Sequence, residues 1–124
     1  CGGDIVGPSN LITFQQTIPE YWKPIEPIFW SRVGHPEKDA EFLKSRSPLF
    51  KVDQLTKPLL IAQGANDPRV KKSESLQMVE ALKKAGKIVE YVEYPDEGHG
   101  FARPENRLDF YGRAEQFLQR RPND

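Results

Sequence analysis

A histidine and an aspartate are the residues of this sequence whose types and positions could carry out chemistry. His99 lies between Gly98 and Gly100, just after a strand-like run at residues 89–94 that Pro95 ends. Glycines on both sides let the backbone turn sharply and leave room for another group to approach the ring. A histidine in such a loop can hold and release a proton near neutral pH. Taken alone, the pattern fits a general base and an ordinary loop histidine equally well.

Asp67 supplies a second group at an equivalent place. It follows the apolar run 58–62, which is typical of a strand buried on both faces, and the helical stretch 73–85 separates it from the strand at 89–94. A strand, a helix and a strand in this order predict a right-handed β-α-β unit with two parallel, neighbouring strands. Neighbouring strands lie about 4.8 Å apart, and parallel strands end at the same edge of the sheet. We therefore expect Asp67 and His99 to meet there.

Such a pair has a defined chemistry. A carboxylate bonded to one ring nitrogen fixes the tautomer of a histidine and stabilises the imidazolium that forms during proton transfer. This is the orienting half of a Ser-His-Asp triad. The order of acid before histidine, and the gap of 99 − 67 = 32 residues, fit the second half of an α/β-hydrolase, whose nucleophile comes first in the chain. The pattern predicts the α/β class, with parallel strands and flanking helices: the C-terminal portion of a three-layer α/β-hydrolase fold.

The third member of a triad is missing from the sequence. An α/β-hydrolase carries its serine in a G-x-S-x-G elbow between a strand and a helix. The nearest approach is Gly7-Pro8-Ser9-Asn10-Leu11, which lacks the second glycine. We therefore reject Ser9 as a nucleophile. The chain opens at Cys1, in the middle of a strand-like segment, so we expect residues 1–124 to be the C-terminal portion of a hydrolase domain whose nucleophile-bearing half is missing.

The other elements are less strongly patterned. Residues 3–6 resemble the end of a buried strand, and a short helix at 11–14 would be capped by the segment before it. Apolar and aromatic residues recur at helical spacing from 21 to 33, which predicts an amphipathic helix that buries its aromatic side chains; a role in a substrate pocket is the alternative. Pro24 suits a first helical turn, whereas Pro27 would lie three residues further in and shift the start of the helix.

A last helix is predicted to begin near Pro104 and to end in the arginines at 120 and 121. Its buried face is expected to consist of six apolar residues: Leu108, Phe110, Tyr111, Ala114, Phe117 and Leu118. The tail at 122–124 is expected to fray.

Composition excludes several classes of function. Among 124 residues, 18 Lys and Arg balance 18 Asp and Glu, so no excess charge directs the protein to nucleic acid. One cysteine and two histidines give no spacing typical of a zinc site, so neither a metal nor a cofactor is expected. No apolar run approaches the ~20 residues of a membrane span. The sequence leaves the compartment, cytoplasmic or periplasmic, undecided.

Two sequence blocks give the chain a family resemblance. Residues 61–70 (IAQGANDPRV) and 94–101 (YPDEGHGF) resemble the C-terminal end of the prolyl oligopeptidase family of serine peptidases. The opening segment 6–11, the dipeptide at 47–48 and the segment 102–107 resemble its acylaminoacyl-peptidase-like members. The similarity extends over almost the whole chain.

The resemblance implies a set of roles. Asp67 would be the acid of the triad, and His99 would act first as general base and then as general acid. Ser9, Ile12 and Val70 would help to line the pocket for the substrate side chain before the scissile bond. Members of the family place a β-propeller before the hydrolase domain and act on peptides, so this chain would lack activity by itself.

Two alternatives stay open at this stage. An esterase or dienelactone-hydrolase-like enzyme would use the same two loops on small esters, and a non-catalytic α/β module would bind a partner instead. The substrate side chain preferred and the choice between exopeptidase and endopeptidase action are also undecided. In the isolated piece, a sheet cut beside the strand that ends at Val6 would expose an open edge, and open edges invite self-association or an exchange of elements.

Overall fold

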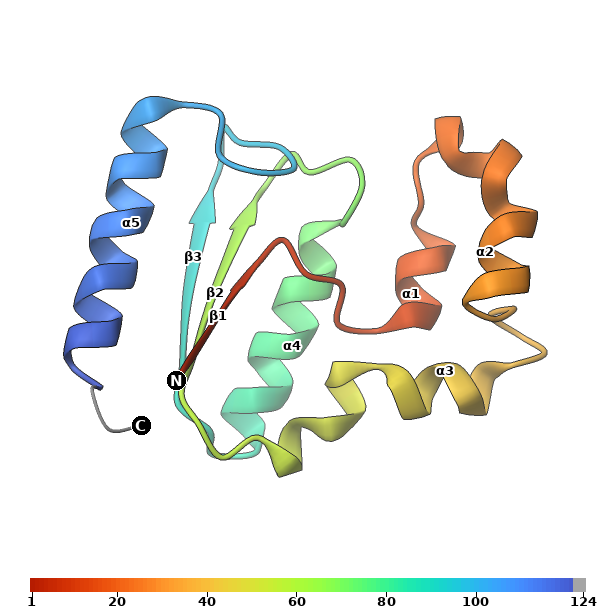
Figure 1. Ribbon diagram of the computed structural model, residues 1–124, viewed down its shortest axis with the longest axis horizontal. Coiled ribbons are helices and arrows are strands. Elements are labelled where there is room, and N and C mark those ends of the chain that lie inside the picture. The colour runs from red at the N-terminus through yellow and green to blue at the C-terminus, as the bar shows by residue number, and fades with distance from the viewer. Residues whose placement is uncertain (122–124) are drawn as a thin grey trace.

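Three parallel strands form the centre of the molecule (Figure 1). The structure is a computed structural model that describes residues 1–121, so the tail expected to fray at 122–124 lies outside the described residues. The elements follow in the order β1 (Gly2–Ile5), α1 (Leu11–Gln16), η1 (Glu20–Ile25), α2 (Glu26–Arg32), α3 (Ala40–Arg46), η2 (Pro48–Gln54), β2 (Leu59–Gly64), α4 (Lys72–Lys84), β3 (Val89–Tyr94) and α5 (Pro104–Gln119), where η marks a 3₁₀ helix.

The strand order is β1-β2-β3, and both pairings are parallel. Ile61, in the middle strand, lies opposite Asp4 on one side and Tyr91 on the other. The predicted β-α-β unit is confirmed: β2 and β3 are parallel neighbours, and α4 lies between them in the chain. Within the described residues, β1 and β3 each pair along one side only, so both outer edges of the sheet are open.

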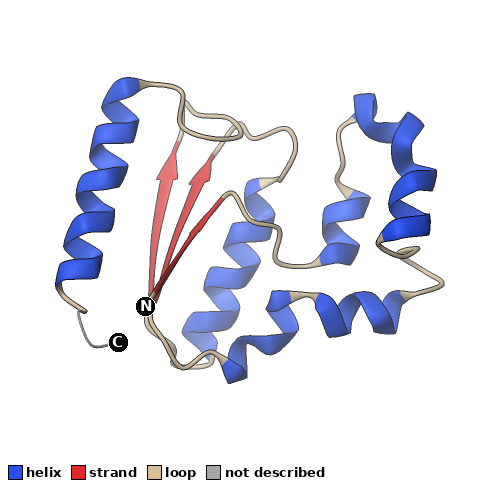
Figure 2. Cartoon of the chain, in the orientation of Figure 1, coloured by secondary structure: helices blue, strands red, loops and turns tan. Residues whose placement is uncertain are grey.

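Helices cover both faces of the sheet, α5 on one and α4 on the other (Figures 1 and 2). Leu60 and Ala62 point to one face and pack with Phe110 and Phe117 of α5. Ile61 points to the opposite face, where Met78, Val79 and Leu82 of α4 meet it. Because both faces of β2 are covered, its residues 59–62 are apolar without alternation. The expected three-layer arrangement of the α/β-hydrolase class is present.

A segment of short helices, residues 11–54, lies beyond α4 (Figure 2). The predicted cap of its first helix is confirmed, because Asn10 Oδ1 accepts a hydrogen bond from Ile12 N at 3.0 Å. The single helix predicted at 21–33 is wrong: a 3₁₀ helix ends at Ile25, and α2 begins at Glu26. Pro27 fixes that boundary, since proline is tolerated in the first turn of an α-helix but not deeper inside it.

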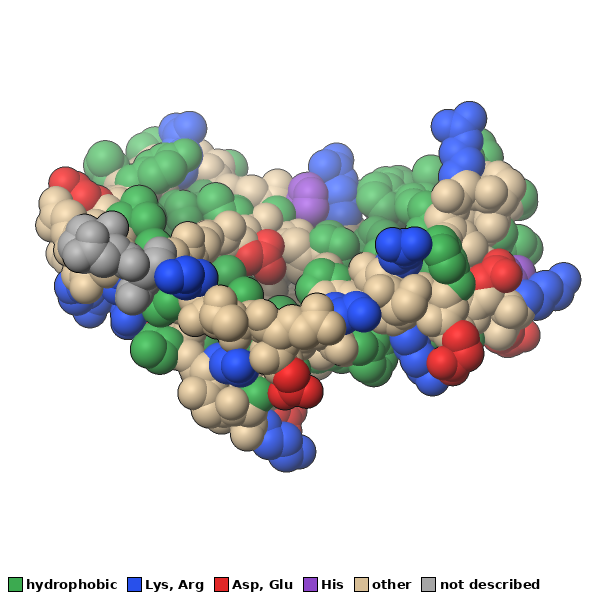
Figure 3. Space-filling model, turned by 60° about the horizontal axis from the view of Figure 1, so that its bottom comes forward, with side chains coloured by type: hydrophobic (Ala, Val, Ile, Leu, Met, Phe, Trp, Pro, Cys, Tyr) green, Lys and Arg blue, Asp and Glu red, His purple; other side chains and the backbone are tan. Residues whose placement is uncertain are grey.

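The predicted burial of this aromatic segment is also wrong for this chain. Tyr21 is 61% exposed, Ile28 51% and Trp30 37%, and neither η1 nor α2 has a buried residue. Trp22 and Phe29 stack on each other with ring centroids 5.8 Å apart. Hydrophobic side chains show on the surface over this segment, at the right of Figure 3. Helical spacing indicates which residues share one face of a helix, but it does not indicate whether another element packs on that face.

The buried face of α5 is narrower than predicted. Of the six apolar residues named for it, Phe110 and Phe117 are buried and Ala114 is partly buried, whereas Leu108, Tyr111 and Leu118 are exposed. At 3.6 residues per turn, positions 110, 114 and 117 share one face of a helix, and positions 108, 111 and 118 turn away from it. The six residues predicted for one buried face of α5 therefore lie on more than one face of the helix. No helix within residues 1–121 is long and apolar enough to cross a membrane.

Candidate active site

Asp67 and His99 meet beyond the carboxyl ends of β2 and β3. The ring nitrogen Nδ1 of His99 lies 2.8 Å from Oδ2 of Asp67, so the contact expected from the two loops is present. The Asp67 side chain is fully buried, and the His99 side chain is 31% exposed. Because a carboxylate oxygen can only accept, this contact places the ring proton on Nδ1. Nε2 is then left with a lone pair that can take a proton from a third group.

The Asp67 carboxylate is held by the backbone that follows it. Its Oδ1 accepts hydrogen bonds from the N–H groups of Arg69 and Val70, both at 2.9 Å. Its Oδ2 accepts one from the side-chain amide of Gln63 at 3.1 Å, in addition to the His99 contact. Both oxygens are therefore fully partnered, and the carboxylate has a single orientation.

The loops that carry the pair are bonded to each other. Ala65 N donates to Tyr94 O at 2.9 Å, and Asn66 N donates to Glu97 O at 2.9 Å. The Asn66 side chain adds a bond from Nδ2 to Pro95 O at 2.7 Å. In the sequence, Asn66 is one residue of the block 61–70, and nothing in its local pattern points to this contact. The two loops behave as one unit, which fixes the separation of the carboxylate and the ring.

Glu97 closes the loop around His99. It is 2% exposed, and its carboxylate accepts the N–H groups of Ala102 and Arg103 and the Nδ2 amide of Asn106, each at 2.9 Å. These bonds join the start of the loop to the first turn of α5. The Asn106 amide, with the two backbone N–H groups, holds the pKa of Glu97 below its usual range although desolvation opposes this. Sequence reading missed Glu97 because it looks like an ordinary loop residue.

Glu97→Gln is expected to lower the melting temperature near neutral pH, because an amide –NH₂ cannot accept the bonds that the second carboxylate oxygen accepts. A lowered pKa contributes stability above the ordinary glutamate range, and this stability is lost as the pH falls through the lowered value. The difference in melting temperature should therefore shrink in acid. Thermal unfolding across pH measures it, with the exposed Glu115→Gln on α5 as control. A difference that stays constant with pH would contradict this role.

The three residues predicted to line a pocket lie in different environments. Ser9 is 4% exposed, and its hydroxyl donates to Glu74 O at 2.6 Å. Val70 is 5% exposed and supports Asp67 through its backbone, whereas Ile12 is partly buried. Of the three, Ile12 has the largest exposed surface in this chain. A role for them at a substrate stays a prediction, and the burial of Ser9 and Val70 counts against direct side-chain contact.

A buried carboxylate ties the helical segment to α4. Glu74 is 1% exposed and accepts hydrogen bonds from Asn10 N at 3.0 Å, Thr13 Oγ1 at 2.5 Å and Gln77 Nε2 at 2.5 Å. The same Gln77 amide also donates to Ser9 Oγ at 2.9 Å. This network fixes the chain between β1 and α1 on the first turn of α4. It contains none of the atoms of the Asp67–His99 pair.

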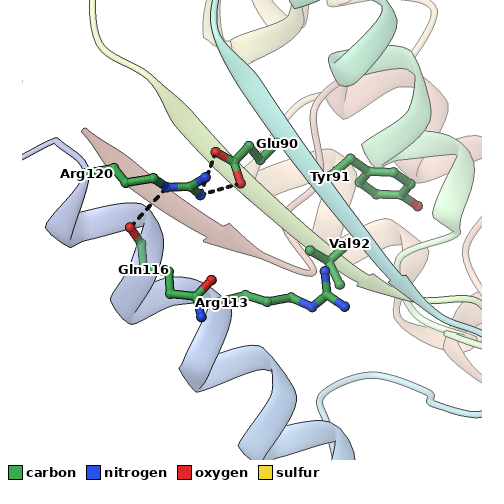
Figure 4. A pocket seen from close by; sticks show the side chains of 6 residues that line it. All are labelled: Glu90, Tyr91, Val92, Arg113, Gln116 and Arg120. Carbon is green, nitrogen blue, oxygen red and sulfur yellow. Dashed lines mark hydrogen bonds and ion pairs between the residues drawn. The ribbon is translucent and has the colours of Figure 1, made fainter.

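A cavity of about 370 Å³ lies between β3 and α5 (Figure 4). Arg120 and Glu90 point toward one another there and form two bonds, at 3.0 and 3.1 Å. Arg113, also in its lining, donates to Asp109 at 2.7 Å. Both arginines in the lining are therefore already paired with carboxylates.

A parallel sheet between two helical layers, with a bonded carboxylate and imidazole in the loops after successive strands, defines part of an α/β-hydrolase domain. Residues 5–123 match the profile of the prolyl oligopeptidase family, and the chain belongs to that family. The resemblance drawn from the two sequence blocks is thus confirmed.

Individual relatives agree with this assignment. Dipeptidyl aminopeptidase BIII of Pseudoxanthomonas mexicana is 54% identical over 120 residues, which are 95% of this chain and 17% of that protein. Dipeptidyl peptidase family member 6 of Caenorhabditis elegans is 52% identical over 122 residues, 96% of this chain and 16% of its own length. The uncomplexed acylaminoacyl peptidase of Pyrococcus horikoshii superimposes with a TM-score of 0.83 at 26% identity, over 96% of this chain and 20% of that one. The chain spans about a sixth of the two sequence relatives.

Proposed function

We propose that residues 1–124 are the C-terminal portion of the catalytic domain of a serine peptidase, in which Asp67 and His99 are two members of a Ser-His-Asp triad. The observation that carries this proposal is the 2.8 Å contact between His99 Nδ1 and Asp67 Oδ2. Family membership supports it. The nucleophilic serine comes from a part of the protein outside these residues, since the sequence contains no G-x-S-x-G elbow.

The proposed mechanism uses the free lone pair of His99. Nε2 takes the proton of the serine hydroxyl as its oxygen bonds to the carbonyl carbon of a peptide, and Asp67 stabilises the resulting imidazolium. The imidazolium then gives its proton to the leaving amine as the C–N bond breaks, which leaves an acyl-serine. Water, deprotonated by His99, hydrolyses this ester, and the serine takes its proton back.

The substrate class follows from the relatives. Two of them are named as dipeptidyl peptidases, and we extend a dipeptidyl-peptidase activity on peptide substrates to the protein that contains this chain. Family membership favours a peptidase over the esterase and the non-catalytic module. Hydrolysis of matched peptide and ester substrates by the longer protein would distinguish the first two, and an upstream sequence without a serine elbow would favour the third.

The open edge of β1 has a consequence for the isolated chain. In the longer protein, we propose that the preceding part of the domain pairs with this edge. Without that part, the unpaired N–H and C=O groups of β1 favour association with a second copy. The isolated chain is then a self-associating and inactive piece of the enzyme.

A fluorophosphonate probe, which reacts with activated serines, tests the division of the triad. We expect no labelling of the 124-residue chain, because Ser9 is buried and hydrogen-bonded, and we expect labelling of a longer chain that includes the upstream residues. Substitution of His99 by alanine in the longer chain should abolish the label. Labelling of the 124-residue chain at any serine would overturn the proposal.

Size-exclusion runs on the same samples report whether the isolated chain associates, and a monomer at all concentrations would contradict the edge pairing.

A further inference from the structure

We propose that Gln63 is a positioning residue for the Asp67–His99 pair and that Ser75 holds the amide oxygen of Gln63 in place; this inference rests on the proposed peptidase function. Gln63 lies in β2 one residue before its end, and it is completely buried. Its Nε2 donates to Asp67 Oδ2 at 3.1 Å, and His99 Nδ1 contacts that same oxygen at 2.8 Å. The amide therefore acts directly on the oxygen that holds the ring.

Partners at both ends hold the Gln63 amide in one orientation. Ser75 lies in α4, is 1% exposed, and donates from Oγ to Gln63 Oε1 at 2.8 Å. Asp67 Oδ2 can only accept and therefore bonds the –NH₂ end of the amide, which leaves Oε1 for Ser75; the hydroxyl alone could bond either end. Nε2 also donates to Val70 O at 3.0 Å, so both of its hydrogens are used. A flipped amide would lose both bonds that Nε2 donates and would place Oε1 against two acceptor oxygens in a site without exposed surface, which has a high cost in free energy.

A neutral donor suits this place better than a cation. The Asp67 carboxylate has to attract a positively charged imidazolium after proton transfer. A lysine or arginine behind Oδ2 would compete for that negative charge, whereas an amide holds the oxygen in position and adds no net charge. The line of contacts from Ser75 through Gln63 and Asp67 to His99 thus transmits the position of α4 to the ring.

Gln63→Glu in the longer, serine-containing protein gives a sharp test. Glutamate keeps the length of the side chain and the acceptor for Ser75, but it places a carboxylate oxygen beside Asp67 Oδ2. Two carboxylates about 3 Å apart cannot both ionise at neutral pH, so the pair keeps one proton and loses it as the pH rises. The shared proton preserves the contact at low pH. At high pH, repulsion displaces Asp67, and we expect kcat to fall about 100-fold with KM unchanged.

The readout is the pH profile of kcat. Wild-type enzyme should reach a plateau on the alkaline side, and Gln63→Glu should show a descending limb there. The matched control is Gln77→Glu, which makes the same chemical change beside the buried Glu74, 2.5 Å away, in a network that contains neither Asp67 nor His99. This control should change stability without adding an alkaline limb. A Gln63→Glu profile that is parallel to that of wild type would overturn the inference.

A second variant covers the case in which Gln63→Glu does not fold. Ser75→Ala removes only the hydroxyl that holds the Gln63 amide oxygen, and we expect kcat to fall about 10-fold with KM unchanged, the pattern of a group that acts in the transition state alone. A wild-type kcat in Ser75→Ala would contradict this role. If the wild-type longer protein neither hydrolyses peptides nor reacts with the fluorophosphonate, the proposed function fails instead, and the two failures are thereby distinguished.

Discussion

Replacing Asp67 by asparagine in the longer, serine-containing protein is expected to lower kcat about 10⁴-fold while the fold stays intact. The surrounding hydrogen bonds determine how asparagine would sit. The N–H groups of Arg69 and Val70 donate to Oδ1 and would hold the amide oxygen there. The –NH₂ group would then occupy the place of Oδ2, facing His99.

This arrangement reverses the histidine tautomer. An –NH₂ group donates to Nδ1 of His99, so the ring proton moves to Nε2, which can no longer accept a proton from the serine. In the wild-type chain the Gln63 amide donates to Oδ2. In the variant the same amide would face the –NH₂ group of asparagine, which is also a donor. The loss should therefore be in kcat and not in substrate binding.

Steady-state kinetics on a peptide substrate, with circular dichroism to confirm folding, measures the effect. Asp53→Asn, at an exposed position in η2, serves as the control and should leave kcat unchanged. His99→Ala is expected to lower kcat as far as Asp67→Asn does, and the double variant should fall little further, because members of a triad act as a unit. A kcat for Asp67→Asn within about tenfold of wild type would remove Asp67 from the mechanism.

The sequence was sufficient to predict the part of the fold that carries the pair. β3 has the predicted bounds, and β2 and α4 begin and end within two residues of the predicted bounds. The reason is physical: residues 59–62 of β2 are covered on both faces and are continuously apolar, while α4 has one covered face and is followed by Gly86 in a positive-φ conformation. Since loops after parallel strands emerge at one edge, the meeting of Asp67 and His99 followed from order alone.

The residues that support the pair could not be found in this way. Gln63, Asn66 and Glu97 are polar residues whose neighbours in the sequence give no periodic signal. Their contacts depend on the direction of a side chain in a loop or near the end of a strand. An example is the bond from Asn66 to Pro95, 29 residues away. Periodicity also failed for the segment at 21–33, because it selects an apolar face without showing what packs on it. Local sequence patterns were thus enough to locate Asp67 and His99. The residues that hold this pair are defined by contacts between distant parts of the chain.

Gly64→Ala is expected to separate the two loops. A Cβ atom at Gly64 would lie 2.1 Å from Gly98 O and 2.6 Å from Glu97 O, and these are backbone atoms that cannot swing aside. The bond from Asn66 N to Glu97 O, and with it the Asp67–His99 contact, should lengthen. Overpacking of this kind costs about 1–3 kcal/mol of stability. A shift of the ring by about 1 Å should lower kcat about 100-fold.

The matched control for this substitution is Gly112→Ala in the middle of α5. A Cβ at Gly112 meets nothing within 4 Å, and alanine is favoured over glycine in a helix by about 1 kcal/mol, so this variant should be slightly more stable than wild type. Urea unfolding of the two variants, with kcat measured in the longer protein, compares a methyl group at the loop contact with one in open space. Equal stability and equal kcat in the two variants would show that the close approach of the loops does not hold the pair together.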